Sequence, residues 1–186
     1  MATCIPSKRA PVRLTAEEVH SLSLQSASRV ADSFSKVNAN DLARVGTAMA
    51  HHESTFNAAA INPQKGSSAA GLTQIVCKTQ WGIEDRMGTP RDTNRERIFD
   101  PAYALCLSMW YLCEHFRRYG TWAKALSAYN QGHPNAAGDR YARTVLAGIT
   151  KLNLAAIESG LRDVAEADPS AASSMDPALF TPGTMG

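Results

Sequence analysis

The pattern of apolar and polar positions predicts a chain of helices. From Thr15 onward, apolar residues recur at spacings of three and four over most of the chain, as on one face of an amphipathic helix. No alternating pattern of useful length appears, although the loop after Glu53 could hold a short hairpin. The sequence therefore predicts an all-α, or mainly α, fold. The expected helices cover residues 15–37, 40–53, 71–82, 100–120, 121–131, 138–152 and 154–165.

Local signals mark the ends of several of these helices. A capping box begins at Thr15, and Asn40 or Asp41 is expected to cap the second helix. A later helix begins at Asp100–Pro101, with proline in its first turn, and ends at Gly120. It is the most apolar helix and is expected to lie at the centre of the fold. Its wide buried face would consist of Tyr103, Leu105, Cys106, Met109, Trp110, Leu112, Cys113 and Phe116.

Two stretches lack helical periodicity. Residues 57–70 contain Asn-Pro, Lys-Gly and Ser-Ser units, which are typical of turns, and they are expected to form a loop. The short segment Gly71–Ile75 is then expected to open a helix that ends near Gly82. Residues 83–98 carry eight charged side chains and little hydrophobic pattern, so they are expected to form an exposed connection. Glu84 and Asp85 would be solvated there.

Length and composition favour one domain with two terminal extensions. A chain of 186 residues with 44% hydrophobic content can bury one core, and two domains would be cramped. Residues 1–14 lack periodicity and are expected to form an arm, and residues 15–166 are expected to form the domain. Residues 167–186 are rich in Ala, Ser, Pro and Gly. They are interpreted as a tail that is either flexible or docked on a partner.

Charge and cysteine content exclude some classes of protein. The net charge is +2, with 19 basic and 17 acidic residues spread along the chain, so no basic footprint for nucleic acid is visible. No apolar run reaches the roughly 18 residues of a membrane span, and the first residues hold no signal-peptide core. Cys106 and Cys113 lie about 10 Å apart along one helix, which is too far for a disulfide. They are interpreted as small buried apolar residues, and reduced, cytoplasmic synthesis is expected.

Glu53 is the candidate catalytic acid. It ends the helix on which Leu42, Val45 and Met49 recur at helical spacing. A carboxylate at the negative end of a helix dipole gains no stabilisation of its charge, so its pKa tends to rise. Apolar neighbours such as Phe56 would raise it further, and a pKa of roughly 6 or above keeps a transferable proton near neutrality. This stretch alone favours a solvated helix-end glutamate, and the rest of the chain changes that interpretation.

Three motifs in order carry a family resemblance. They are Glu53-Ser54 at a helix end, Asn62-Pro63 leading through Ser67 to Gly71-Leu-Thr-Gln-Ile75, and Ala128-Tyr-Asn-Gln-Gly132. With them, the stretch from about Asp41 to Val145 resembles a lytic transglycosylase domain of the soluble lytic transglycosylase (SLT) type. The resemblance includes the long helix after Asp100 and a tyrosine after the third motif. It implies a lysozyme-like fold.

The resemblance also implies roles for particular residues. Glu53 would be the sole catalytic acid and base, and no metal or cofactor is implied. The other implied roles are orientation of Glu53 by Ser54, lining of the sugar groove by Gln74, a hydrogen bond near Glu53 from Tyr129, a sugar contact by Asn130, and closure of the far wall by Tyr141. One departure is Cys77, which stands where the family often has a proline.

A single carboxylate suffices for the reaction that the resemblance implies. Cleaving a glycosidic bond requires a proton for the leaving oxygen and stabilisation of an oxocarbenium-like carbon. Ordinary glycosidases use a second carboxylate, but none falls within the three motifs. In the family's reaction, the 6-hydroxyl of N-acetylmuramic acid attacks its own anomeric carbon. The expected substrate is therefore a peptidoglycan glycan strand, cut at the β-1,4 bond between MurNAc and GlcNAc to give 1,6-anhydroMurNAc ends.

Three alternatives compete with this interpretation. His51-His52-Glu53 offers metal-ligand types, but a zinc-protease pattern would need a histidine where Phe56 stands. A muramidase of the goose-lysozyme kind would hydrolyse the bond with water held by a further acid, and Asp85, Asp92 and Asp100 are the candidates. A structural component of a virion or a secretion machine would bind glycan without cleaving it.

The route to the substrate is a further expectation. Peptidoglycan lies outside the inner membrane, and the first residues do not resemble a signal peptide, so a carrier is expected. The simplest carrier is a phage virion, which is assembled in the host cytoplasm and opens the wall from the periplasm during genome entry. A secretion or conjugation system that delivers the protein to the periplasm is the alternative. The two terminal segments would then contact other virion proteins.

Overall fold

The structure is a computed structural model that describes residues 7, 9–64 and 66–167. Over this range the chain forms helices, and the β-type pairings are isolated bridges such as that between Ile61 and Ala70. The predicted all-α class is confirmed, and the hairpin expected after Glu53 is reduced to these bridges. The elements are α1 (Ala16–Ala31), α2 (Ala39–Ser54), α3 (Cys77–Arg86), the 3-10 turn η1 (Arg97–Phe99), α4 (Pro101–Tyr119), α5 (Trp122–Gln131), α6 (Ala136–Lys151) and α7 (Leu154–Ala167).

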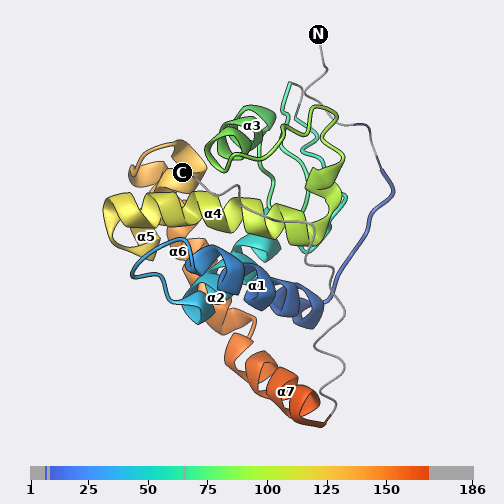
Figure 1. The fold of residues 1–186 in the computed structure, drawn as a ribbon, viewed down its shortest axis with the longest axis vertical. Coiled ribbons are helices and arrows are strands. Elements are labelled where there is room, and N and C mark those ends of the chain that lie inside the picture. Colours follow the sequence, from blue (N-terminus) through green and yellow to red (C-terminus); the bar gives the residue numbers. More distant parts are fainter. Residues whose placement is uncertain (1–6, 8, 65, 168–186) are drawn as a thin grey trace.

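Helix α4 lies at the centre of the molecule. In Figure 1 it runs across the middle of the view, with α1 and α2 below it and α3 above it, and it packs against α1, α2, α3 and α5. Its side chains Leu105, Leu107, Met109 and Leu112 are fully buried. Burial of a side chain of this size contributes about 1.5–3 kcal/mol, so this helix anchors the core. The prediction of a central buried helix is confirmed.

Several helix boundaries differ from the prediction, and α3 ends at Arg86 instead of near Gly82. Helix α1 ends at Ala31 instead of Val37, because the following turn passes through Lys36 with a left-handed φ of 71°. Helix α2 is capped by Asn38, whose side chain accepts a hydrogen bond from the Asp41 backbone at 3.1 Å. Helix α6 begins two residues earlier than expected, because the side chain of Asn135 caps it. In each case a short polar side chain or turn sets the end of the helix.

The segment Gly71–Ile75 does not open a helix, and this prediction is wrong. Gly71 and Gln74 have left-handed φ values of 76° and 51°, which interrupt any helical run. A Cβ at Gly71 would lie 2.1 Å from the carbonyl oxygen of Ile98, so only glycine fits at this close approach. The segment therefore forms a tight turn, and α3 starts later, at Cys77.

The connection after Ile83 is partly buried, which contradicts the prediction for Glu84. The Glu84 side chain is fully buried and accepts hydrogen bonds from the Gln80 side chain at 3.0 Å, from the Asp92 backbone at 3.0 Å and from the Tyr103 hydroxyl. Buried charges persist in proteins when they are paired and hydrogen-bonded. Asp85, by contrast, is exposed and pairs with Arg91 at 2.6 Å, as expected for a solvated residue.

The described part of the predicted arm lies along the loop after α2. The backbone of Leu14 donates a hydrogen bond to the Phe56 carbonyl at 3.0 Å, and the backbone of Ala58 donates to the Val12 carbonyl at 2.8 Å. These contacts hold the start of the chain next to the end of α2. The predicted tail, residues 167–186, lies outside the described residues except for Ala167, the last residue of α7.

The predictions for the cysteines are confirmed in part. Cys106 and Cys113 are buried and form no disulfide, as predicted. Cys77 is disulfide-bonded, so the expectation of reduced cysteines is wrong for this residue. Among the residues that the structure describes, no helix combines the length and apolar content needed to cross a membrane.

Candidate active site

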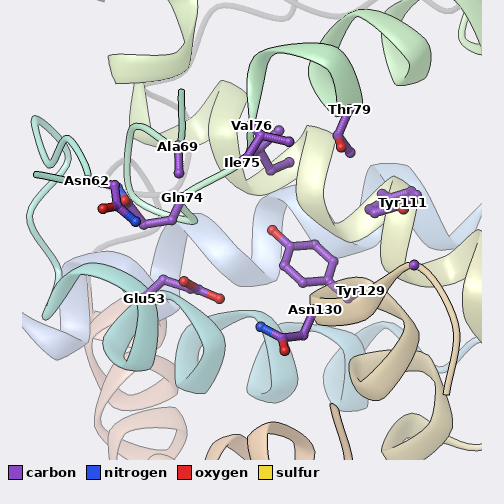
Figure 2. A pocket seen from close by; sticks show the side chains of 11 residues that line it. Glu53, Asn62, Ala69, Gln74, Ile75, Val76, Thr79, Tyr111, Tyr129 and Asn130 are labelled. Carbon is purple, nitrogen blue, oxygen red and sulfur yellow. The ribbon is translucent and has the colours of Figure 1, made fainter. Parts of the chain in front are cut away.

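Glu53 lies in a cavity of about 390 Å³. It is the penultimate residue of α2, whose end is fixed by Thr55 in a left-handed conformation with φ of 51°. Figure 2 shows the Glu53 carboxyl group, the Tyr129 hydroxyl and the Asn130 amide pointing toward the same space. Helix α2 thus places one carboxyl group among neutral side chains. The cavity is lined by Glu53, Asn62, Ala69, Gln74, Ile75, Val76, Thr79, Tyr111, Tyr129, Asn130 and Gly132.

Burial changes the acidity of Glu53. Removal of the carboxyl group from water raises its pKa to about 7, because a charged carboxylate is poorly solvated there. A hydrogen bond from the Tyr141 hydroxyl, 2.6 Å from Oε1, acts in the opposite direction and lowers the pKa. At neutral pH about half of the molecules therefore carry a proton on Glu53. This side chain can both donate a proton and take one back.

The turn at Gly71–Ile75 forms one wall of the cavity. The Gln74 side chain lines the cavity, and its amide nitrogen donates to the carbonyl oxygens of Ala60 at 3.2 Å and Gly71 at 2.9 Å. Gln74 thus lies where the family resemblance places it, and it also braces the turn. Because two hydrogen bonds fix its side chain, little conformational entropy remains to be lost when a sugar binds.

Ser54, which the resemblance assigns to orienting Glu53, forms hydrogen bonds with two backbone carbonyl groups. Its hydroxyl group is 2.8 Å from the carbonyl oxygen of Leu72 and 3.1 Å from that of Ala50, and it forms no hydrogen bond with Glu53. It therefore ties the last turn of α2 to the Gly71–Ile75 turn. Any effect of Ser54 on Glu53 passes through the backbone.

The two site tyrosines form hydrogen bonds with different partners. Tyr129, on α5, lines the cavity and donates its hydroxyl to the Thr73 carbonyl at 3.0 Å, whereas the bond to Glu53 comes from Tyr141 on α6. Tyr141 is buried and is not among the cavity residues, so it supports Glu53 and does not form the far wall. Asn130 lines the cavity, as the resemblance implies.

A comparison with protein families agrees with this geometry. A family model for the Transglycosylase SLT domain matches residues 35–144, which is more than half of the 186 residues. The chain belongs to the SLT transglycosylase family. The match covers Glu53, the Gly71–Ile75 turn and Tyr141. It supports a peptidoglycan lytic transglycosylase activity and the lysozyme-like helical fold of this family. No curated protein matches the sequence.

The SLT site contains residues that sequence reasoning missed. Tyr111, on the central helix α4, lines the cavity, and its ring centroid is 5.6 Å from that of Tyr129. Its only signal in the sequence is an aromatic residue beside a long apolar stripe, which also fits the core. Asn62 lines the cavity as well. It begins the second sequence motif, but the family resemblance implies no role for it. Thr79 and Val76 gave no signal.

The three acids considered for a muramidase have other partners in this SLT domain. Asp85 pairs with Arg91, Asp92 accepts a hydrogen bond from the Arg97 backbone at 2.8 Å, and Asp100 caps α4. None of them is among the residues that line the cavity. Among the described lining residues, Glu53 is the single acid.

The metal interpretation of His51-His52-Glu53 finds no support in the side-chain arrangement. Within residues 7, 9–64 and 66–167, no group of three or more His, Cys, Asp or Glu residues could hold a metal ion. His51 and His52 line a separate groove between α2 and α6. Glu53 instead lines the cavity described above, which we call the sugar cavity. Successive positions on a helix point in directions about 100° apart, which explains this separation.

Replacement of Tyr141 by phenylalanine is expected to shift the pH profile of wall cleavage to higher pH. Proton donation requires protonated Glu53, so activity falls as the pH rises through its pKa of about 7. The Tyr141 hydrogen bond lowers that pKa, so its removal raises the pKa and moves the alkaline limb upward. Loss of a hydrogen bond to a charged group also lowers the maximal rate, by roughly 10- to 100-fold. The measurement is the rate of peptidoglycan cleavage from pH 5 to 9.

Tyr119→Phe is the matched control. This substitution deletes the same hydroxyl group from a tyrosine at the end of α4 that does not line the cavity. It should leave the profile unchanged. An alkaline limb that stays in place, or moves to lower pH, in Tyr141→Phe would contradict the role of this hydrogen bond.

Proposed function

We propose that this SLT domain cleaves the β-1,4 bond between MurNAc and GlcNAc of peptidoglycan without water and leaves 1,6-anhydroMurNAc ends. The observation that carries the proposal is the single partly protonated carboxyl group in a cavity whose other polar lining groups are amides, hydroxyls and phenols. A hydrolase of this fold would need a second acid to hold water. The intramolecular reaction needs only positioning of the substrate.

The proposed reaction uses Glu53 twice. Protonated Glu53 gives its proton to the glycosidic oxygen as the bond from that oxygen to the anomeric carbon breaks. The 6-hydroxyl oxygen of the same MurNAc then bonds to the anomeric carbon, and its proton passes to the Glu53 carboxylate. The carboxyl group is thereby restored, and no water is consumed. A pKa near 7 suits both steps, because the donor and acceptor forms are about equally populated at neutral pH.

Neutral side chains around Glu53 fit the positioning role. Asn130 and Asn62 line the cavity with amide groups, and Tyr129 and Tyr111 line it with aromatic side chains. Amides match sugar hydroxyl and acetamido groups as donors and acceptors, and the two rings supply a flat apolar surface. Correct placement of a reacting hydroxyl group is worth up to about 7–11 kcal/mol in well-oriented intramolecular reactions.

Product analysis tests the proposal directly. Purified peptidoglycan is digested with the protein, and the released muropeptides are weighed by mass spectrometry. We expect products that end in 1,6-anhydroMurNAc and are lighter by one water than the products of a muramidase digest of the same material. Reducing ends as the main product would overturn the proposal in favour of hydrolysis. Release of nothing would favour a glycan-binding structural protein.

Delivery of the enzyme stays a prediction from the sequence. A phage virion as the carrier, action in the periplasm during genome entry and contacts of the terminal segments with other virion proteins all belong to this prediction. The alternative of a secretion or conjugation system stands beside it. The cavity geometry is compatible with either route, because it concerns only the glycan.

A further inference from the structure

A second groove lies between α2 and α6, and none of its lining residues lines the sugar cavity. Its volume is about 600 Å³. The two helices approach closely here, because a Cβ at Gly148 would already lie 3.4 Å from the Cβ of Ala48. Longer side chains beside this crossing form the walls. We call this site the basic groove, and its lining residues are Ala48, His51, His52, Thr55, Arg143, Thr144, Ala147, Gly148 and Lys151.

The charges that line the basic groove have one sign. Arg143 and Lys151 are exposed on α6, about two turns apart, and no acidic residue lines the groove. Among the described residues, neither of them forms an ion pair with a carboxylate. Burial, and to a smaller extent the charge of His51, lower the pKa of His52, so His52 adds little positive charge near neutrality. The groove is therefore suited to an anion.

The sugar cavity has the complementary character. No lysine, arginine or histidine is among its lining residues, and its polar groups other than Glu53 are neutral. Peptidoglycan, however, is not a neutral polymer: each MurNAc carries a peptide stem whose free carboxyl groups are ionised at neutral pH. No positively charged side chain lines the sugar cavity to pair with those carboxylates. Any cation that binds the anionic part of the substrate must therefore lie elsewhere on the surface.

One side chain, Tyr141, lies between the wall of the basic groove and the catalytic carboxyl group. The His52 ring, in the wall of the groove, packs edge-on against the Tyr141 ring with centroids 5.0 Å apart, and the Tyr141 hydroxyl is bonded to Glu53. Because the stem is attached to the sugar that is cleaved, its carboxylates lie within the length of this short peptide from Glu53 when the bond is cut. The position of the groove meets this condition.

We propose that the basic groove binds the carboxylates of the peptide stem, with Arg143 and Lys151 as the cations that contact them. The inference rests on the proposed function, since it assumes peptidoglycan in the sugar cavity. It adds a preference: strands that carry peptide stems are cut faster than bare strands. Exposed charge pairs contribute about 0.2–1 kcal/mol each, so two pairs in the middle of this range should change kcat/KM roughly three- to tenfold.

The test compares soluble glycan strands with free-carboxylate stems, the same strands with amidated stems, and strands stripped of stems by an amidase. We expect the double variant Arg143→Gln/Lys151→Gln to lose roughly three- to tenfold in kcat/KM on free-carboxylate strands and to stay within about twofold of wild type on stripped strands. Amidation of the stems should lower wild-type kcat/KM to the level of the variant. Added salt should reduce the wild-type preference as well, because exposed charges are screened.

Arg140→Gln combined with Lys124→Gln is the matched control. It removes two exposed positive charges that line neither cavity and should leave the preference intact. Equal losses of the groove variant on all strands, or no loss on any, would overturn the proposal. Stem-independent binding of anionic phospholipid vesicles that requires Arg143 and Lys151 would also overturn it, in favour of a lipid phosphate. Failure of the proposed function has a different signature, since wild type would then release no anhydro ends even from stripped strands.

Discussion

Replacing Glu53 with glutamine is expected to lower peptidoglycan cleavage by about a thousandfold or more. Glutamine keeps the shape of the side chain but has no transferable proton. A general acid or base contributes about 10²–10⁴ to a rate, and Glu53 is proposed to act as both. Among the described residues that line the cavity, none besides Glu53 has a carboxyl group. The measurement is release of soluble muropeptides from purified peptidoglycan, with Glu17→Gln on the exposed start of α1 as the matched control.

The same variant should be folded, and above pH 7 it should be more stable than wild type. Burial raises the Glu53 pKa to about 7 in the folded state, from 4.5. The folded protein thus holds this proton more tightly than the unfolded chain does, and wild type loses stability as the pH rises from about 4.5 to 7. The loss is roughly 2–3 kcal/mol, since one pKa unit corresponds to about 1.4 kcal/mol. Glutamine has no such loss.

Thermal melts at pH 5 and pH 8.5 separate the two effects. The stability of Glu53→Gln relative to wild type should increase between these pH values, while that of Glu17→Gln should not. Near-wild-type cleavage by Glu53→Gln would remove Glu53 from the catalytic role. A stability difference that does not change with pH would show that the Glu53 carboxyl group is solvated.

Replacing Arg95 with methionine is expected to destabilise the fold by about 3–5 kcal/mol. Arg95 is fully buried and donates hydrogen bonds to the Ile75 carbonyl at 2.6 Å, to the Gln80 side chain at 2.9 Å and to the Ser68 carbonyl. Methionine fills similar volume but leaves these acceptors without that donor. It also removes a positive charge near buried Glu84. Removing one partner from a buried charged network costs about this much.

Unfolding by urea or heat measures this effect, and a shift in Tm on the order of 10 °C is expected for a domain of this size. Arg91→Met is the matched control, because Arg91 pairs with Asp85 at the surface and its replacement should leave Tm nearly unchanged. A change below about 1 kcal/mol for Arg95→Met would contradict the structural role. Activity at low temperature should also fall, since Ile75 forms part of the cavity wall.

The sequence determined the elements whose signals act over a few residues. The capping box at Thr15, the Asp100 cap with Pro101, and Gly120 at the end of α4 lie where they were predicted. These signals depend on hydrogen bonds between positions three or four apart, so contacts with distant residues change these helix ends little. The place of Glu53 at the end of α2 follows from the same local pattern.

The tertiary structure decided which groups meet. The hydrogen bond to Glu53 comes from Tyr141, 88 positions away in the sequence, and not from Tyr129. The buried Glu84 accepts a hydrogen bond from Tyr103, 19 positions away. The Gly71–Ile75 turn takes its form from an approach to Ile98 that no local pattern records. Hydrogen bonds of this kind depend on how helices pack, and packing depends on the whole core at once. The sequence by itself thus determined the helices and the catalytic candidate, whereas the partners and the acidity of Glu53 depend on burial that only the assembled fold provides.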